Sequence, residues 1–305
     1  MKKYLKYSLV LPIVIFGIIF SCTKKDPNAP KSDTIVEGKT SILVDETLLP
    51  IIEDQLAVFE NNYNSKITLL PKSEKESILA LTNGKADIVV LSRKLNKKEI
   101  AIFKQKEIVP RSTSFAIDAI VFIKNKKSND TLIAIKDVVD FIKGNKSSIK
   151  GLVFDNPNSS TVRYLCELAG VNALPEEGFF SFKTNEDVIK YVSENDGIVG
   201  VVGNNWLCQP NQQMQKYVGA VTILSVKGIN TNNYVFPSQD NVGKRIYPLA
   251  RVLFIVNCQG YEGLGMGFAS FIAGEKGQRI ILKSGLAPMR EPSRNIRIKN
   301  KIQTK

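Results

Sequence analysis

The sequence predicts an α/β fold of two lobes joined by two crossover strands that form a hinge. Three observations lead to this fold class. Short apolar strands alternate with segments of helical apolar spacing from residue 41 onward, as in a sheet covered by helices. A polar stretch, 124–131, follows the apolar strand 116–123, and another apolar strand, Arg251–Asn257, comes much later. The chain is therefore expected to leave the first lobe near residue 124 and to return near residue 235.

The first lobe is predicted to contain three strand–helix pairs. Pro50 stands near the start of the first helix, where its missing N–H costs nothing, and Asn83-Gly84 ends the second helix. The last strand is a continuous apolar run, which is typical of a buried, largely parallel sheet. The pairs are strand Ser41–Val44 with helix Leu48–Tyr63, strand Lys66–Leu70 with helix Glu74–Leu81, and strand Asp87–Leu91 with helix Lys97–Lys104.

The second lobe is predicted to be another α/β unit, from Leu132 to about Val226. We place lobe 1 at residues 39–123 plus 235–290 and lobe 2 at residues 124–234. The elements expected in lobe 2 are strand Gly151–Phe154, helix Thr161–Ala169, helix Asn185–Ser193 and strand Gly197–Val202, and two helices, Leu264–Gly274 and Glu275–Leu282, follow the returning strand.

The N-terminal residues carry the pattern of an export signal. Lys2, Lys3 and Lys6 precede an apolar run, 9–20, which is shorter than the 20 or so residues that span a bilayer. The small residue Ser21 and then Cys22 follow this run, as in a bacterial lipoprotein cleavage box, so we predict a signal peptide at residues 1–21 and acylation of Cys22. The alternative is a plain signal peptide with an incidental cysteine. The protein is then expected in the cell envelope, anchored to a membrane and facing the periplasm or the exterior.

Two further segments are predicted to lie outside the fold. Residues 22–38 are rich in Lys, Asp, Asn, Pro and Ser and have few apolar side chains, so they are predicted to be a flexible tether after the lipid anchor. Residues 291–305 form a basic tail.

Composition excludes several classes of function. The formal net charge of +13 favours anionic partners, but export and the lack of a basic cluster interleaved with aromatic residues argue against nucleic acid. The chain has no histidine, which removes Ser-His-Asp and Cys-His catalytic arrangements and the usual zinc sites. The other cysteines, Cys166, Cys208 and Cys258, lack CxxC spacing. We therefore predict a protein without enzymatic activity, metal or cofactor.

Four predicted strand-to-helix turns carry polar side chains at the start of a helix. Helix N-termini present free backbone N–H groups, and in an open α/β sheet they gather at the carboxyl ends of strands, where ligands bind. The turn Asn158–Thr161 has three consecutive hydroxyls, although one helix cap needs only one. Ser73-x-x-Glu76 and Asn96-x-x-Glu99 also match capping boxes, so these residues have an ordinary structural explanation. The turns are Asp45-Glu46-Thr47, Ser73-Glu74, Ser92-Arg93 and Asn158-Ser159-Ser160-Thr161.

Arg93 is the strongest charged candidate, because it follows an apolar strand and a guanidinium matches a tetrahedral oxyanion in bidentate geometry. A surface arginine is the ordinary alternative. Arg163 lies one turn into the helix after the hydroxyl loop. The nearby acids, Asp45, Glu46 and Asp155, could pair with Arg93 or Arg163, cap a helix, or accept a hydrogen bond from a protonated anion.

These turns resemble those of the substrate-binding proteins of phosphate ABC transporters, and more closely their compact lipoprotein branch from Bacteroidetes-type bacteria. The resemblance implies a type II periplasmic-binding-protein fold, a two-strand hinge and an anion held by neutral donors at helix N-termini. The matching segments are VDETLLPIIEDQLAVFE (44–60), SEKESILALTNGKADIVVLSRKL (73–95), FAIDAIVFI (115–123), FDNPNSSTVRYL (154–165), YPLARVLFIVN (247–257) and GQRIILKSGLAPM (277–289).

The resemblance implies a ligand set that includes the hydroxyls of both lobes. Two positions depart from the family pattern: Arg93 stands where the family has Asp, and Asp155 is found where the family has Arg before the second-lobe loop. With the turns above, the predicted ligand residues are Thr47, Leu48 through its backbone N–H, Ser73, Ser92, Arg93, Ser159, Ser160 and Thr161.

The sequence thus predicts a monomeric, lipid-anchored solute-binding protein that captures phosphate or a related tetrahedral oxyanion and delivers it to the permease subunits of an ABC transporter. The alternative is a non-transport receptor, a sensor or a surface interaction protein that keeps the fold, and the departures at Arg93 and Asp155 leave this alternative open. An exported hydrolase is a third possibility, which the lack of histidine and of metal-ligand clusters disfavours.

Overall fold

The computed structural model describes residues 33–293. The predicted signal peptide, Cys22, most of the tether and most of the basic tail lie outside the described residues. The described residues belong to one compact unit. Among residues 33–293, no helix combines the length and the apolar character needed to cross a membrane.

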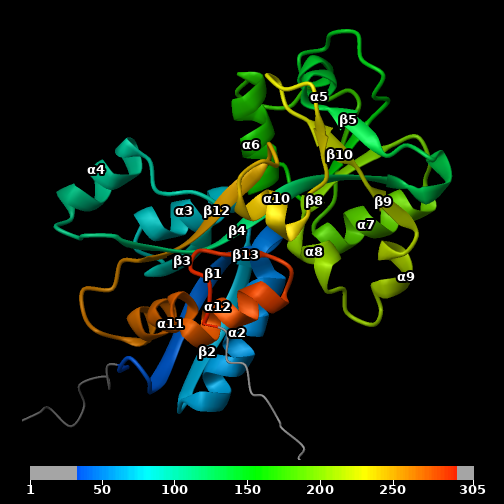
Figure 1. Cartoon of the computed structure of the whole chain (residues 1–305). Coiled ribbons are helices and arrows are strands. Elements are labelled where there is room, and N and C mark those ends of the chain that lie inside the picture. Colours follow the sequence, from blue (N-terminus) through cyan, green and yellow to red (C-terminus); the bar gives the residue numbers. More distant parts are fainter. Residues whose placement is uncertain (1–32, 294–305) are drawn as a thin grey trace, which may run out of the picture. The chain divides into compact units, whose positions relative to one another are not determined.

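The first half of the fold contains the three predicted strand–helix pairs (Figure 1). Ser73 and Asn96 form the predicted capping boxes, each accepting from the N3 backbone N–H while the N3 glutamate accepts from the cap. The elements are β1 (Gly38–Asp45), the 3₁₀ turn η1 (Glu46–Leu48), α2 (Leu49–Asn62), β2 (Ser65–Lys72), α3 (Glu74–Thr82), β3 (Ile88–Leu91) and α4 (Lys97–Gln105), joined later by β12 (Ala250–Asn257), α11 (Leu264–Ala273), α12 (Glu275–Lys283) and β13 (Ala287–Pro288).

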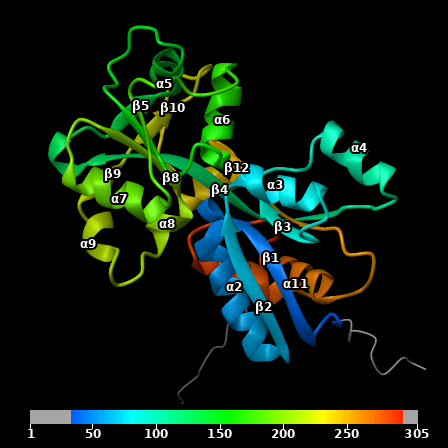
Figure 2. The same ribbon diagram turned by 180° about the vertical axis from the view of Figure 1, so that it is seen from behind.

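The second half lies on the other side of the long strand β4 (Arg111–Asn125), as Figures 1 and 2 show. Its elements are η2 (Lys126–Ser128), β5 (Leu132–Ala134), α5 (Ile135–Ile142), β6 (Leu152–Phe154), α6 (Ser160–Ala169), β7 (Phe179–Ser181), α7 (Asn185–Glu194), β8 (Val199–Gly203), α8 (Asn205–Cys208), α9 (Gln215–Val218), β9 (Val221–Ile223), β10 (Ser225–Lys227), β11 (Tyr234–Val235) and α10 (Gln239–Gly243).

One sheet runs through both halves, in the order β2-β1-β3-β12-β4-β8-β6-β7. Strand β4 pairs with β12 through its first part and with β8 and β9 through its last part, so it belongs to both halves. Pairing is parallel among β1, β2 and β3 and among β6, β7 and β8, whereas β4 and β12 are antiparallel to each other. The α/β class predicted from the sequence is confirmed.

Strand β4 is longer than the predicted strand 116–123. Its first residues, from Arg111 to Ser114, are polar and therefore lack the apolar run that marks a strand, but they pair with Phe254–Asn257 of β12. At the other end Lys124 and Asn125 continue the strand into the segment that was expected to be a loop. Backbone pairing across the sheet overrides local polarity at both ends.

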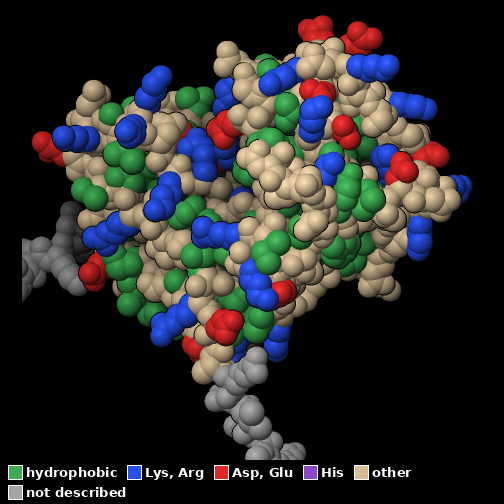
Figure 3. Space-filling model, turned by 45° about the horizontal axis from the view of Figure 1, so that its top comes forward, with side chains coloured by type: hydrophobic (Ala, Val, Ile, Leu, Met, Phe, Trp, Pro, Cys, Tyr) green, Lys and Arg blue, Asp and Glu red, His purple; other side chains and the backbone are tan. Residues whose placement is uncertain are grey.

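The buried apolar side chains form separate cores in the two halves. One cluster contains buried residues between Ile117 and Leu249, together with Ala287. Two others contain residues between Ile42 and Ala116 and residues from Leu253 onward. On the face that Figure 3 shows, Lys, Arg, Asp and Glu side chains are dispersed among apolar ones. The residue limits predicted for the two lobes remain a prediction.

Candidate functional site

The candidate site starts at the N-terminus of α6. Strand β6 ends at Phe154, and Asp155 and a short turn lead to Ser159, whose hydroxyl caps the helix by accepting from Val162 N. The hydroxyls of Ser159 and Thr161 lie 2.8 Å apart, and both side chains are buried. The turn therefore places more hydroxyls in the interior than helix capping requires.

Asp155 is the acceptor on which donors from both halves converge. Its Oδ2 accepts from Thr47 Oγ1 of η1 at 3.0 Å and from Asn185 Nδ2 of α7 at 3.3 Å. Its Oδ1 accepts from Thr161 Oγ1 at 3.0 Å. Only 1% of Asp155 is exposed, and Thr47, Thr161 and Asn185 are fully buried. A ring of neutral donors thus encloses a pair of carboxylate oxygens.

Two further carboxyl groups, Asp45 and Glu46, border this ring. Asp45 Oδ1 accepts from Thr47 N at 3.2 Å, while its buried Oδ2 has no hydrogen-bond partner among the described residues. Glu46 accepts from both the backbone N–H and the Nδ2 of Asn185. Burial, and then the charge of Glu74, raises the pKa of Asp45 to about 7. Burial, and then the charge of Asp155, raises the pKa of Glu46 to about 8, so near neutral pH Glu46 is mostly protonated and Asp45 is partly protonated.

A buried cation, Arg251, lies beneath the α6 turn. Arg251 stands directly opposite Asp118 in the β12–β4 pairing, and its Nε and Nη2 donate to Asp118 Oδ2 at 3.2 and 2.9 Å. Its Nη1 donates to Ser160 Oγ at 2.8 Å. Burial raises the pKa of Asp118. The almost fully buried guanidinium therefore connects the central strands to the hydroxyl turn.

Arg93 does not join the hydroxyl ring. Its Nη1 and Nη2 bind Glu99 at 2.9 and 2.8 Å in a bidentate pair, and its Nε donates to Glu74 Oε1 at 3.0 Å. Arg163 also binds Glu74, through Nε at 2.5 Å, so the buried Glu74 connects α3 to α6. Ser92 Oγ donates to the same carboxylate at 3.2 Å. The guanidinium of Arg93 is therefore occupied by two carboxylates.

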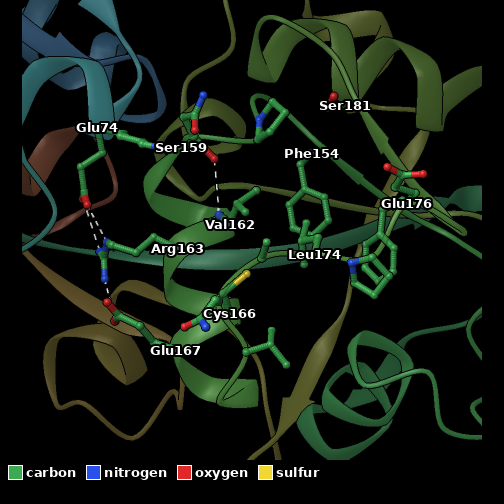
Figure 4. Close-up of a pocket in the computed structure, with 18 of the residues that line it drawn as sticks. Glu74, Phe154, Ser159, Val162, Arg163, Cys166, Glu167, Leu174, Glu176 and Ser181 are labelled. Atoms are coloured by element: carbon green, nitrogen blue, oxygen red, sulfur yellow. Dashed lines mark hydrogen bonds and ion pairs between the residues drawn. The ribbon is translucent and has the colours of Figure 1, made fainter. Parts of the chain in front are cut away.

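A pocket of about 860 Å³ opens beside these residues (Figure 4). Glu74 and Arg163 form its polar end, where Figure 4 shows their ion pair, and Phe154 and Leu174 line its apolar part. A second pocket, of about 530 Å³, is lined in part by Glu46, which borders the ring of donors around Asp155. The ring of neutral donors is thus buried, and the two pockets lie beside it. In the described part of the chain, no three His, Cys, Asp or Glu side chains are grouped to hold a metal ion.

The structure brings together some of the predicted ligand residues and separates others. Thr47 and Thr161 meet at Asp155, with Ser159 and Ser160 beside them. Ser73 instead caps α3, since its hydroxyl donates to Glu76 Oε2 at 2.7 Å and accepts from Glu76 N. Leu48 is buried next to Thr47, and Ser92 and Arg93 surround Glu74. These residues remain predicted ligands.

Several residues of the site were not among the predicted ligands. Asn185, Asn205 and Trp206 carry no sequence signal, although both Asn205 Nδ2 and Trp206 Nε1 donate to Thr47 O, at 2.8 and 3.0 Å. Arg251 and Asp118 did carry a sequence signal: each is a charged residue within an apolar run of its strand, which points to a buried partner.

Known proteins share this architecture. A protein from Clostridium perfringens, assigned as a phosphate ABC transporter substrate-binding protein and solved with bound phosphate, is 19% identical with a TM-score of 0.68, covering 83% of this chain and 100% of that one. An ABC-type phosphate transport receptor from Vibrio cholerae is 18% identical with a TM-score of 0.61, over 82% and 100%. PstS from Borrelia burgdorferi is 23% identical with a TM-score of 0.51, over 84% and 100%. At these identities the likeness establishes the fold.

No curated protein sequence matches the chain. Residues 28–276, however, match the model of the PBP superfamily domain. The match agrees with the predicted superfamily, and the structural neighbours confirm the predicted periplasmic-binding-protein fold, while the Bacteroidetes-type branch remains a prediction. The chain belongs to the PBP superfamily.

Proposed function

We propose that this protein is an extracytoplasmic, lipid-anchored solute-binding protein that captures phosphate or a related tetrahedral oxyanion for an ABC transporter. One observation carries the proposal: the hydroxyls of Thr47 and Thr161, which come from different halves, converge with Asn185 Nδ2 on a pair of anionic oxygens. A ring of neutral donors that holds a carboxylate also matches the oxygens of a dehydrated oxyanion.

The charges around the ring are compatible with an anion. Asp45 and Glu46, with pKa values raised by burial to about 7 and about 8, carry less negative charge near neutral pH than ordinary carboxyl groups do. Arg251 brings a buried positive charge to Ser160 at the N-terminus of α6, where the helix dipole has its positive end. In this proposal Arg93 acts by neutralising Glu74 and Glu99 and contacts the ligand only if those pairs open.

Delivery to permease subunits and membrane anchoring complete the proposal. The phosphate-transport proteins that share the fold support delivery to a permease. The position of Cys22, just after the apolar segment 9–20 and Ser21, supports membrane anchoring. Capture would enclose the ligand between the lobes about the β4 and β12 strands, which are central to the sheet.

Calorimetric titration of the full chain, purified in detergent, with phosphate, arsenate and sulfate tests this function. Thr161→Val keeps the side-chain shape and deletes a donor to the ligand. A charge-assisted hydrogen bond contributes about 1.5–3 kcal/mol, so phosphate binding should weaken roughly ten- to a hundredfold. Thr222→Val on β9 is the matched control and should bind as the parent does. If the Thr161 variant binds phosphate like the parent, the proposed pocket is wrong.

One observation favours a second function, that of a receptor outside transport. The donors expected to bind the oxyanion already bind Asp155. A parent protein that binds none of the three oxyanions would support the receptor and overturn oxyanion capture.

A further inference from the structure

We propose that Asp155 is an intramolecular competitor of the oxyanion, which holds the ligand-binding hydroxyls until the ligand replaces it. The inference rests on the proposed function and concerns the same site. In this proposal Asp155 controls how tightly the site binds the oxyanion.

The hydrogen bonds of Asp155 support this role. Both carboxylate oxygens are used, Oδ2 by Thr47 and Asn185 and Oδ1 by Thr161, at 3.0 to 3.3 Å. A tetrahedral oxyanion that binds Thr47 and Thr161 needs these same two hydroxyls, and a hydroxyl has a single proton to donate. The carboxylate and the oxyanion therefore exclude each other from the two donors.

Two neighbouring carboxylates are held by cations instead. Asp118 is paired with Arg251, and Glu74 is paired with Arg93 and Arg163. Within residues 33–293, Asp155 forms no ion pair, although it is almost fully buried. A buried carboxylate held by neutral donors alone is easier to replace than one paired with a cation, because its departure leaves no cation unpaired.

The contact also joins the two halves. Thr47 belongs to η1 and Asp155 follows β6, so the bond between them crosses from one half to the other. Entry of an oxyanion requires this bond to break, and the repulsion between the two anions favours separation. When only a fraction of the molecules has free donors, the apparent affinity falls by that fraction.

Titration of Asp155→Asn with inorganic phosphate tests the inference. Asparagine keeps the volume of the side chain, removes its charge and leaves one acceptor. The variant should bind phosphate at least about tenfold more tightly than the parent, the gain expected when a state populated below about 10% becomes the main one. Asp187→Asn is the matched control: Asp187 is a half-buried acid in the first turn of α7, but it accepts from Thr184 rather than from the ring. Its phosphate affinity should stay that of the parent.

The outcomes separate this inference from the function on which it rests. If Asp155→Asn binds phosphate equally or more weakly while the parent binds it, Asp155 is not a competitor and the function stands. If neither protein binds phosphate, arsenate or sulfate, both are overturned. Stopped-flow kinetics on the parent gives a test that needs no variant: the observed rate of phosphate binding should reach a plateau as phosphate is raised, because Asp155 must leave first. A rate that rises linearly up to millimolar phosphate contradicts the competitor.

Discussion

Replacement of Arg251 by methionine is the sharpest test of the buried charges beneath the site. The change keeps an unbranched apolar stem and removes the guanidinium, which leaves the Asp118 carboxylate buried and unpaired. The side chains of the pair are 1% and 0% exposed, so water cannot replace the lost cation. Breaking a buried pair by removing one partner costs about 3–5 kcal/mol, and Ser160 loses a donor as well.

These magnitudes predict a large loss of stability. At about 2–4 °C per kcal/mol, Arg251→Met should lower the melting temperature by roughly 6–20 °C, as measured by calorimetry or circular dichroism. The double variant Arg251→Met/Asp118→Asn should lose less than Arg251→Met alone, because no buried charge remains unpaired. Lys244→Met is the control: its pair with Asp240 is mostly exposed and should be worth less than about 1 kcal/mol. Two results would contradict this role of the ion pair. One is a cost of Arg251→Met below about 1 kcal/mol. The other is a loss in the double variant that equals the sum of the losses in Arg251→Met and Asp118→Asn measured singly.

Two other predictions concern pH and the membrane. Because burial raises the pKa values of Asp45 to about 7 and of Glu46 to about 8, the folded chain keeps protons that the unfolded chain releases near pH 4. Their stabilising effect is full below pH 4 and is lost as the pH rises through 7 and 8, so the free energy of unfolding in urea should fall by at least about 2 kcal/mol from pH 5 to pH 8. Glu46→Gln should flatten this decline, whereas the control Glu167→Gln, at an exposed acid, should not. A free energy of unfolding that rises from about pH 5 to pH 8 would refute the raised pKa values of Asp45 and Glu46. Cys22→Ser should release the protein from the membrane fraction or leave an unprocessed precursor, and a variant that fractionates and migrates like the parent would contradict the lipid anchor.

The sequence by itself determined the alternation of strands and helices and the way several helices begin. Apolar spacing predicted α2 and α4 to within one or two residues, and the patterns at Ser73 and Asn96 predicted both capping boxes. These features depend on residues three or four positions apart, which the sequence displays directly. It also located the turns at Thr47 and at Ser159–Thr161, because a helix start follows a strand end in each case.

Only the tertiary structure decided which of these groups face one another. Thr47 and Asp155 are 108 positions apart, and Arg251 meets Asp118 across 133 positions because the β12–β4 register places them opposite each other. Arg93, the most attractive single residue for an anion, is bound instead by Glu99 and Glu74. The partner of a charged side chain depends on strand register and on the packing of distant helices, and neither is encoded in the local spacing of residues.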